Sequence, residues 1–150
     1  MERSLIITGG TISAGEANSI TTLYVNNSLI MKPGSLYDWK FGNTTISEAD
    51  RINCGALTLQ TTENSITVNV IKTSGTTDPD YTLVLFQTTG ITGSTNSIFM
   101  DYSGSPNINS PVNPSFDGDN VVVSDLTPEP AMICTLFIFI LAFIRKMFRY

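Results

Sequence analysis

The clearest alternation of apolar and polar positions lies in residues 65–71, where Ile66, Val68 and Val70 alternate with Thr67 and Asn69. A period of two is typical of a β-strand with one buried face. Turn signals rich in Pro, Gly and Asp separate similar short runs, and no long apolar pattern of helical period occurs before residue 131. The pattern predicts a mainly β body, with further strands at Ile20–Val25, Leu29–Met31, Ser35–Phe41, Ala56–Leu59, Tyr81–Phe86, Ser97–Tyr102 and Asn120–Val123.

A loose internal repeat indicates how these strands are arranged. The segment VNNSLIMKPGSLYDWKF from Val25 resembles the segment INCGALTLQTTENSITVNV from Ile52. The offset between corresponding positions drifts from 27 to about 30 residues, as insertions in turns would cause. We therefore expect the end of a parallel β-helix, or solenoid, with a less regular β cap, and keep a β-sandwich as the alternative.

Composition divides the chain into three parts. Residues 1–103 form the predicted β body, and Ser, Thr and Asn make up 46 of residues 1–130, which suits strands and turns. Residues 104–130 are rich in Pro, Asn, Ser, Gly and Asp, so we expect one last strand there, followed by a surface linker. Residues 131–150 are apolar and then basic.

The C-terminal part is predicted to be a transmembrane helix with a basic tail. Residues 131–144 carry no charge, and Arg145, Lys146 and Arg149 follow. The apolar run spans about 21 Å as a helix, and snorkelling of the first two cations lengthens its reach toward a ~30 Å hydrocarbon core. A buried core helix is the alternative. Because basic flanks stay on the cytoplasmic side, the span would place residues 1–130 outside the cytoplasm.

The net charge and the N-terminal sequence bear on the partners and on the start of an exported chain. Residues 1–130 hold 13 acidic and five basic residues, a formal charge of −8, which argues against nucleic acid as a partner. Residues 1–3 carry charges, but only Leu5, Ile6 and Ile7 follow them where a signal peptide needs a longer apolar stretch. We expect the chain to be the C-terminal piece of a longer exported protein, or to start upstream of Met1.

The tail resembles the PEP-CTERM protein-sorting signal of bacteria. It contains Thr127-Pro128-Glu129-Pro130, then the uncharged run, then the basic end at residues 145–150. The resemblance covers about the last 24 residues. It implies that Pro128, Glu129 and Pro130 are recognised by a membrane-embedded exosortase-type processing enzyme. It also implies that the helix retains the protein in the inner membrane, that the cations Arg145, Lys146 and Arg149 stop transfer, and that the product reaches the envelope or an exopolysaccharide layer.

The body is similar to the terminal part of bacterial passengers built from autotransporter-associated β-strand repeats. The similarity is carried by GTISAGEANSITTLYVNNSLIMKPGSLYDWKFG, then ADRINCGALTL, and later DYTLVLFQTTG. It implies a surface β-solenoid to which no chemistry is assigned. A stalk of a polysaccharide-active β-helix enzyme or adhesin, whose active part lies upstream, is the alternative function.

Candidate chemistry is sparse. The chain has no histidine, which excludes Ser-His-Asp and Cys-His catalysis and His-ligated zinc. The acidic pairs Asp78 with Asp80 and Asp117 with Asp119 are interpreted as turn residues, and the aromatic stripe of residues 37–41 as core packing with sugar stacking as the alternative. We therefore predict a non-enzymatic protein with no catalytic, metal or cofactor site and with no cofactor.

Overall fold

A computed structural model describes residues 4–17, 19–42, 49–73, 82–105 and 112–124. These residues are mainly β, as predicted, and contain no α-helix. A 3-10 turn, η1 (Thr95–Ser97), precedes the ninth strand. The strands are β1 (Leu5–Ile7), β2 (Thr11–Ser13), β3 (Thr22–Met31), β4 (Leu36–Phe41), β5 (Arg51–Leu59), β6 (Ile66–Lys72), β7 (Thr82–Gln87), β8 (Ile91–Thr92), β9 (Ile98–Asp101), β10 (Ser115–Asp117) and β11 (Asn120–Ser124).

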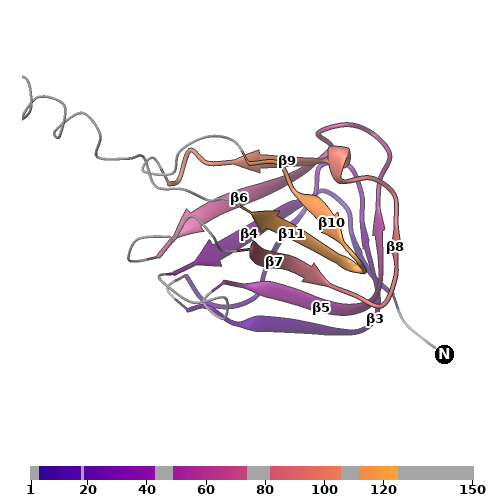
Figure 1. The fold of residues 1–150 in the computed structure, drawn as a ribbon, viewed down its shortest axis with the longest axis horizontal. Coiled ribbons are helices and arrows are strands. Elements are labelled where there is room, and N and C mark those ends of the chain that lie inside the picture. The colour runs from indigo at the N-terminus through magenta and orange to yellow at the C-terminus, as the bar shows by residue number, and fades with distance from the viewer. Residues whose placement is uncertain (1–3, 18, 43–48, 74–81, 106–111, 125–150) are drawn as a thin grey trace, which may run out of the picture.

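The strands form two sheets, and the chain passes repeatedly from one to the other. The larger sheet has the order β1-β3-β5-β7-β11-β10, with β8 also paired to β5, and the smaller sheet has the order β2-β4-β6-β9. From β1 to β9 all neighbouring strands are parallel. Figure 1 shows β3, β5 and β7 of the larger sheet lying side by side in that order. Each passage through both sheets is called a coil below.

The strand β3 turns a corner within the larger sheet. The register of β3 against β5 shifts between Val25 and Ser28, so that Asn26 and Asn27 lie opposite the single residue Gly55. A shift of this kind bends a strand. The halves of β5 accordingly have different neighbours, since β7 pairs with its first half and β8 with its second. A Cβ added to Gly55 would lie 2.9 Å from the carbonyl oxygen of Asn27, so this corner needs glycine.

The parallel register confirms the correspondence that the internal repeat predicted. Leu29 is paired with Leu57 and Met31 with Leu59. Some boundaries were wrong: Ile20–Val25 and Leu29–Met31 form one strand, β3, and β5 begins at Arg51 rather than Ala56. The strands β1, β2, β8 and β10 were not predicted, because two or three residues are too few to show a period.

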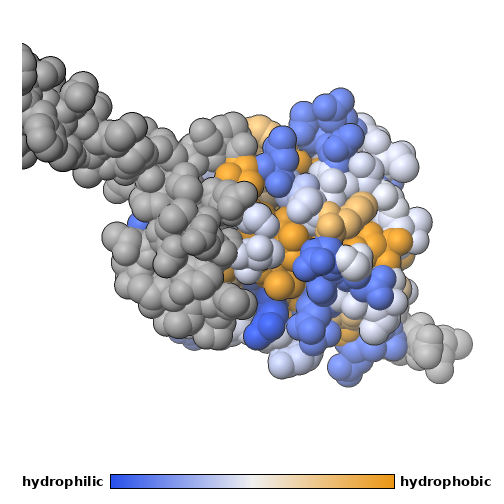
Figure 2. Space-filling view, in the orientation of Figure 1, coloured by the Kyte–Doolittle hydropathy of each residue, from blue (hydrophilic) through white to orange (hydrophobic). Residues whose placement is uncertain are grey.

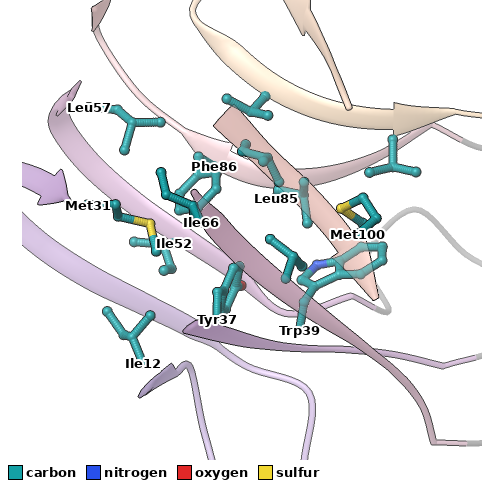
Figure 3. Close-up of a cluster of buried hydrophobic side chains, with 14 of the residues drawn as sticks. Ile12, Met31, Tyr37, Trp39, Ile52, Leu57, Ile66, Leu85, Phe86 and Met100 are labelled. Carbon is teal, nitrogen blue, oxygen red and sulfur yellow. The ribbon is translucent and has the colours of Figure 1, made fainter. Parts of the chain in front are cut away.

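Side chains from both sheets meet in one hydrophobic core (Figure 3). Tyr37 of the smaller sheet packs against Phe86 of the larger, with ring centroids 5.4 Å apart. Both side chains have no exposed area. Burial of one large apolar side chain stabilises a fold by about 1.5–3 kcal/mol, so contacts of this kind hold the two sheets together.

An antiparallel hairpin, β10–β11, covers the C-terminal edge of the larger sheet. The strand β11 pairs with β7 along its whole length, and its residues Val121 and Val123 are fully buried. The predicted strand Asn120–Val123 is thus confirmed. The prediction of a single strand within residues 104–130 was wrong, because Ser115–Asp117 forms the second arm of the hairpin.

Candidate functional site

The residues to which the resemblance gave roles lie outside the part of the chain that the structure describes. This holds for the sorting motif Pro128, Glu129 and Pro130, and for the stop-transfer residues Arg145, Lys146 and Arg149. The helix predicted for residues 131–150 lies outside it as well. Within the residues that are described, no helix is long and apolar enough to cross a membrane.

The acidic pair Asp117 and Asp119 lies at the hairpin turn between β10 and β11. Asp117 is paired with Asn120, and Gly118 between the two acids has a φ of 58°. The Thr88 hydroxyl donates a hydrogen bond of 2.6 Å to the Asp119 carbonyl oxygen. The interpretation of this pair as turn residues is therefore confirmed, whereas Asp78 and Asp80 lie outside the described residues.

The aromatic stripe of β4 faces the interior. Tyr37, Trp39 and Phe41 have no exposed area, and the rings of Trp39 and Phe41 stack with centroids 5.3 Å apart. Stacking of a sugar on this stripe is therefore excluded, and its interpretation as core packing is confirmed.

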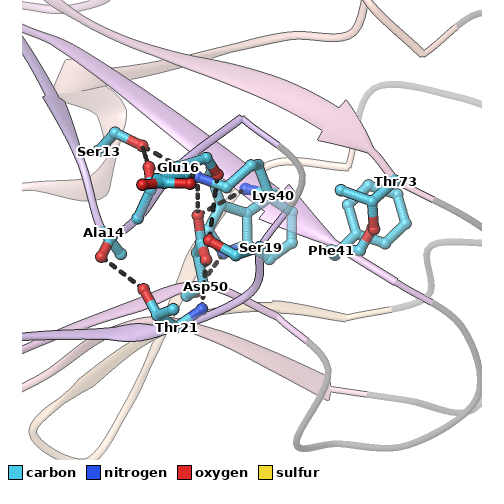
Figure 4. Close-up of polar contacts among 11 residues, drawn as sticks. Ser13, Ala14, Glu16, Ser19, Thr21, Lys40, Phe41, Asp50 and Thr73 are labelled. Atoms are coloured by element: carbon cyan, nitrogen blue, oxygen red, sulfur yellow. Dashed lines mark hydrogen bonds and ion pairs between the residues drawn. The ribbon is translucent and has the colours of Figure 1, made fainter.

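The most concentrated polar chemistry in the described residues is a buried cluster around Lys40 and Asp50. Alternation along β4 directs Lys40 away from its aromatic neighbours, toward the segment that joins β2 to β3. Its ammonium Nζ lies 2.7 Å from Asp50 Oδ2 and donates to Ser13 Oγ at 2.9 Å and to the Gly15 carbonyl oxygen at 3.3 Å. We call Ser13, Gly15, Thr21, Lys40 and Asp50 the polar clamp (Figure 4).

Asp50 connects three parts of the chain. Its Oδ1 accepts the backbone N–H of Thr21 at 2.8 Å, and its Oδ2 accepts the backbone N–H of Lys40 at 3.3 Å. Its own backbone N–H donates to the Lys40 carbonyl oxygen, and its carbonyl oxygen accepts the Trp39 indole N–H at 2.7 Å. The carboxylate thus fixes the entry of β3, the end of β4 and the start of β5.

The ion pair of Lys40 and Asp50 at the centre of the clamp is saturated and closed to solvent. The side chains of Lys40 and Asp50 are 2% and 0% exposed, and all three ammonium protons have an acceptor. Charges removed from water are stable only when they are fully paired and hydrogen-bonded in this way. The arrangement therefore suits a structural role in holding successive coils, and leaves no ammonium proton for a substrate.

Two other buried ionisable groups are held in their neutral forms. Burial, and then the negative charge of Asp50, raise the pKa of Tyr37 well above its ordinary value. Its hydroxyl has no hydrogen-bond partner among the residues that the structure describes. Burial raises the pKa of Cys54 to about 11 against a smaller opposing effect of a backbone hydrogen bond from Leu29. Since the thiolate is the reactive form, Cys54 is a core residue rather than a nucleophile.

A second polar cluster lies on the outer side of the smaller sheet. Register aligns Ser13, Asp38, Asn69 and Asp101 in one row across β2, β4, β6 and β9, which we call the outer polar row. Asn69 Nδ2 donates to Asp38 Oδ1 at 2.7 Å, and the backbone N–H of Ser103 donates to Asp101 Oδ1 at 2.9 Å and lowers the pKa of Asp101. The side chains of the outer polar row are half-buried or exposed. Among the described residues, no group of three or more His, Cys, Asp or Glu could hold a metal ion.

The sequence analysis identified neither cluster. Lys40 and Asp50 are ten positions apart, and no sequence motif marks such a pair. The outer polar row had a weak signal, since Asp38 and Asn69 occupy the polar positions of two predicted strands. The repeat offset of about 30 residues would have aligned them.

Comparisons with known proteins found no relative of this chain. No protein-family model matches it, and no curated protein and no solved structure is significantly similar to it.

Proposed function

We propose that this chain is the C-terminal part of a longer, non-enzymatic bacterial surface or extracellular-matrix protein. Its body is the end of a parallel β-solenoid, and a PEP-CTERM signal directs its export and sorting. The body acts as a spacer or matrix element. The inner membrane and an exosortase-type enzyme are its partners during sorting, and an exopolysaccharide layer is a candidate final partner.

The observation that carries the proposal is the repeated parallel register of successive coils. One core row runs through Ile12, Tyr37, Val68 and Met100 of the smaller sheet, one residue from each strand. Another runs through Leu5, Leu29, Leu57 and Ile91 of the larger sheet. Stacking of such units builds a rod whose length grows with the number of coils, and this suits a spacer.

The distribution of polar groups also supports a passive role. The Lys40–Asp50 ion pair of the polar clamp is buried and saturated, and Cys54 is a buried core residue. The charged side chains of Lys40 and Asp50 therefore serve the contacts between coils. The sorting part of the proposal is supported by the sequence of the tail, where a Pro-Glu-Pro motif, an uncharged run and a basic end occur in that order.

The sorting assignment is tested in a bacterium that encodes an exosortase-type enzyme. We expect the double variant Pro128→Ala with Pro130→Ala to enter the membrane but to keep its tail, because the recognition motif is lost. Intact mass measures tail removal, and the double variant Pro106→Ala with Pro111→Ala is the matched control. Normal processing of the first variant would reject the assignment.

Membrane anchoring is tested separately by changing Arg145, Lys146 and Arg149 to Ser. We expect this variant to be anchored poorly, because the cations that stop transfer on the cytoplasmic side are lost. Extraction with alkaline carbonate measures anchoring. If the unchanged chain is fully released without detergent before its tail is removed, the transmembrane helix is disproved.

A further inference from the structure

The two edges of the larger sheet are covered to different degrees. At the C-terminal edge, β11 and β10 follow β7, and Val121 and Val123 are fully buried. At the other edge, β1 pairs only with Leu29–Met31. In the described part of the chain, no strand pairs with Thr22–Val25 on the side away from β5. Among the described residues, the first half of β3 is therefore an open strand edge.

The backbone of this half strand is oriented for a further partner. In a parallel pair, alternate residues direct both N–H and C=O toward the same neighbour. The backbone N–H of Arg51 in β5 bonds to the Thr21 carbonyl oxygen at 3.2 Å. Residues 21, 23 and 25 therefore face β5, and Thr22 and Tyr24 direct their backbone groups toward the open side.

The core rows are less well covered at this edge. In the row Leu23, Ile52 and Phe86, the second and third residues have no exposed area, whereas Leu23 is half-buried. Leu5, at the end of its own row, is 38% exposed. On the face shown in Figure 2, hydrophobic residues lie among polar ones.

The open edge also lacks the residues that block strand addition. Proteins protect exposed edges with charges or proline. Neither Leu5–Ile7 nor Thr22–Val25 contains a charged residue or proline, whereas β10 follows Pro114 and ends at Asp117. This difference favours an N-terminal edge that is covered in the intact protein.

We propose that the edge of Thr22–Val25 binds a parallel β-strand of the same polypeptide that runs directly into Ser4. The path of the next coil identifies this occupant. In β3 the corner Asn26–Asn27 joins Val25 to Ser28, and Ser28 lies beside Ser4, with their hydroxyl oxygens 2.5 Å apart. A strand that followed the same corner would arrive at Ser4 without a connecting loop.

The proposal rests on the solenoid interpretation given under the proposed function, and it specifies the incoming segment. That segment is extended and carries apolar side chains where it stacks on Leu23 and Val25. By the register of β3 it occupies about six positions before Ser4, four in the strand and two in the corner. The proposal therefore places part of it upstream of Met1.

The edge can be tested in the full chain in detergent by replacing residues 2 and 3 with a second copy of Thr22–Asn27 (TLYVNN) directly before Ser4. We expect hydrogen exchange of the Thr22 and Tyr24 amides to slow about tenfold or more, because both gain a carbonyl acceptor. The matched control carries TPYPNN at the same place, since its prolines cannot complete the pairing. The amide of Asn53, inside the sheet, is the internal reference.

Equal exchange of Thr22 and Tyr24 in the TLYVNN and TPYPNN chains would overturn the proposal. So would protection of both amides in the unextended chain together with a dimer in sedimentation, because the edge would then bind a second copy. An in-frame stop codon directly upstream of Met1 in the source genome would also overturn it. None of these measurements involves tail processing. If they overturn the proposal for the strand edge, the sorting assignment is not affected.

Discussion

The polar clamp and the outer polar row share Ser13, but their charged residues lie in different environments. Both join successive coils through a side chain of β4, Lys40 in the clamp and Asp38 in the row. Lys40 and Asp50 of the clamp are closed to solvent, whereas Asp38 and Asp101 of the row are only half-buried. Loss of a partner in the clamp therefore leaves a buried charge, while water can replace a lost partner in the row. Position, more than residue type, decides how strongly a polar group holds the coils.

The largest effect is expected from Asp50→Ala. The substitution leaves the Lys40 ammonium buried without its counter-charge and removes the acceptor of the Thr21 N–H. We expect the free energy of unfolding to fall by about 3–5 kcal/mol, as measured by denaturant titration of the full chain in detergent.

The double variant Lys40→Met with Asp50→Ala separates charge from backbone effects. It removes both charges, so we expect it to be more stable than Asp50→Ala alone. Recovery is incomplete, because the Thr21 N–H still lacks its acceptor. A loss below about 1 kcal/mol in the single variant would show that the buried pair does not hold the coils.

The pH dependence of stability separates interior from surface groups. Burial raises the pKa of Tyr102 to about 12, against a smaller effect of its contact with the Val112 carbonyl, and that of Cys54 to about 11. Their ordinary values are 10.0 and 9.0, so between these values and the raised ones the unfolded chain loses protons that the folded chain keeps. Stability should fall as pH rises from about 9 to 12.

Asp101 of the outer polar row has the opposite dependence. Hydrogen bonds from Ser103 lower its pKa below 3.8, so its contribution is present above that pH and is lost as pH falls through the lowered value. Denaturant midpoints measured across both ranges test the contrast. The double variant Tyr102→Phe with Cys54→Ala should make the loss of stability at alkaline pH less steep, with Tyr37, whose pKa is also raised, accounting for what is left, and should leave the acid dependence unchanged. If the loss of stability at alkaline pH were unchanged in this variant, Tyr102 and Cys54 would not be its cause.

Local patterns predicted the strands with a clear period but not the contacts between distant parts of the chain. The alternation of Ile66, Val68 and Val70 predicted β6, and the repeat predicted that Leu29 lies beside Leu57. Both depend on apolar spacing that short segments retain. The clamp could not be predicted, because its members come from separate segments and charged residues usually lie at the surface.

The short strand β1 shows a different limit. In the sequence, Leu5–Ile7 is only an apolar stretch too short for a signal peptide. Three apolar residues have no period of their own, so they do not predict a strand. Its role follows from the register with Leu29–Met31, which only the folded arrangement provides. The same holds for the hairpin arm β10, whose three exposed residues include only one large apolar side chain, Phe116.

The smallest effect is expected in the outer polar row. Asn69→Ala removes the donor to Asp38 where water can take its place, so we expect the free energy of unfolding to fall by about 0.5–1 kcal/mol.

Asn69→Asp instead aligns three carboxylates across β4, β6 and β9. Like charges opposite one another destabilise a sheet, and salt screens their repulsion. Denaturant titrations at low and high salt should therefore show that salt restores stability to Asn69→Asp but not to Asn69→Ala. Equal salt responses would mean that the three side chains do not form a row in solution.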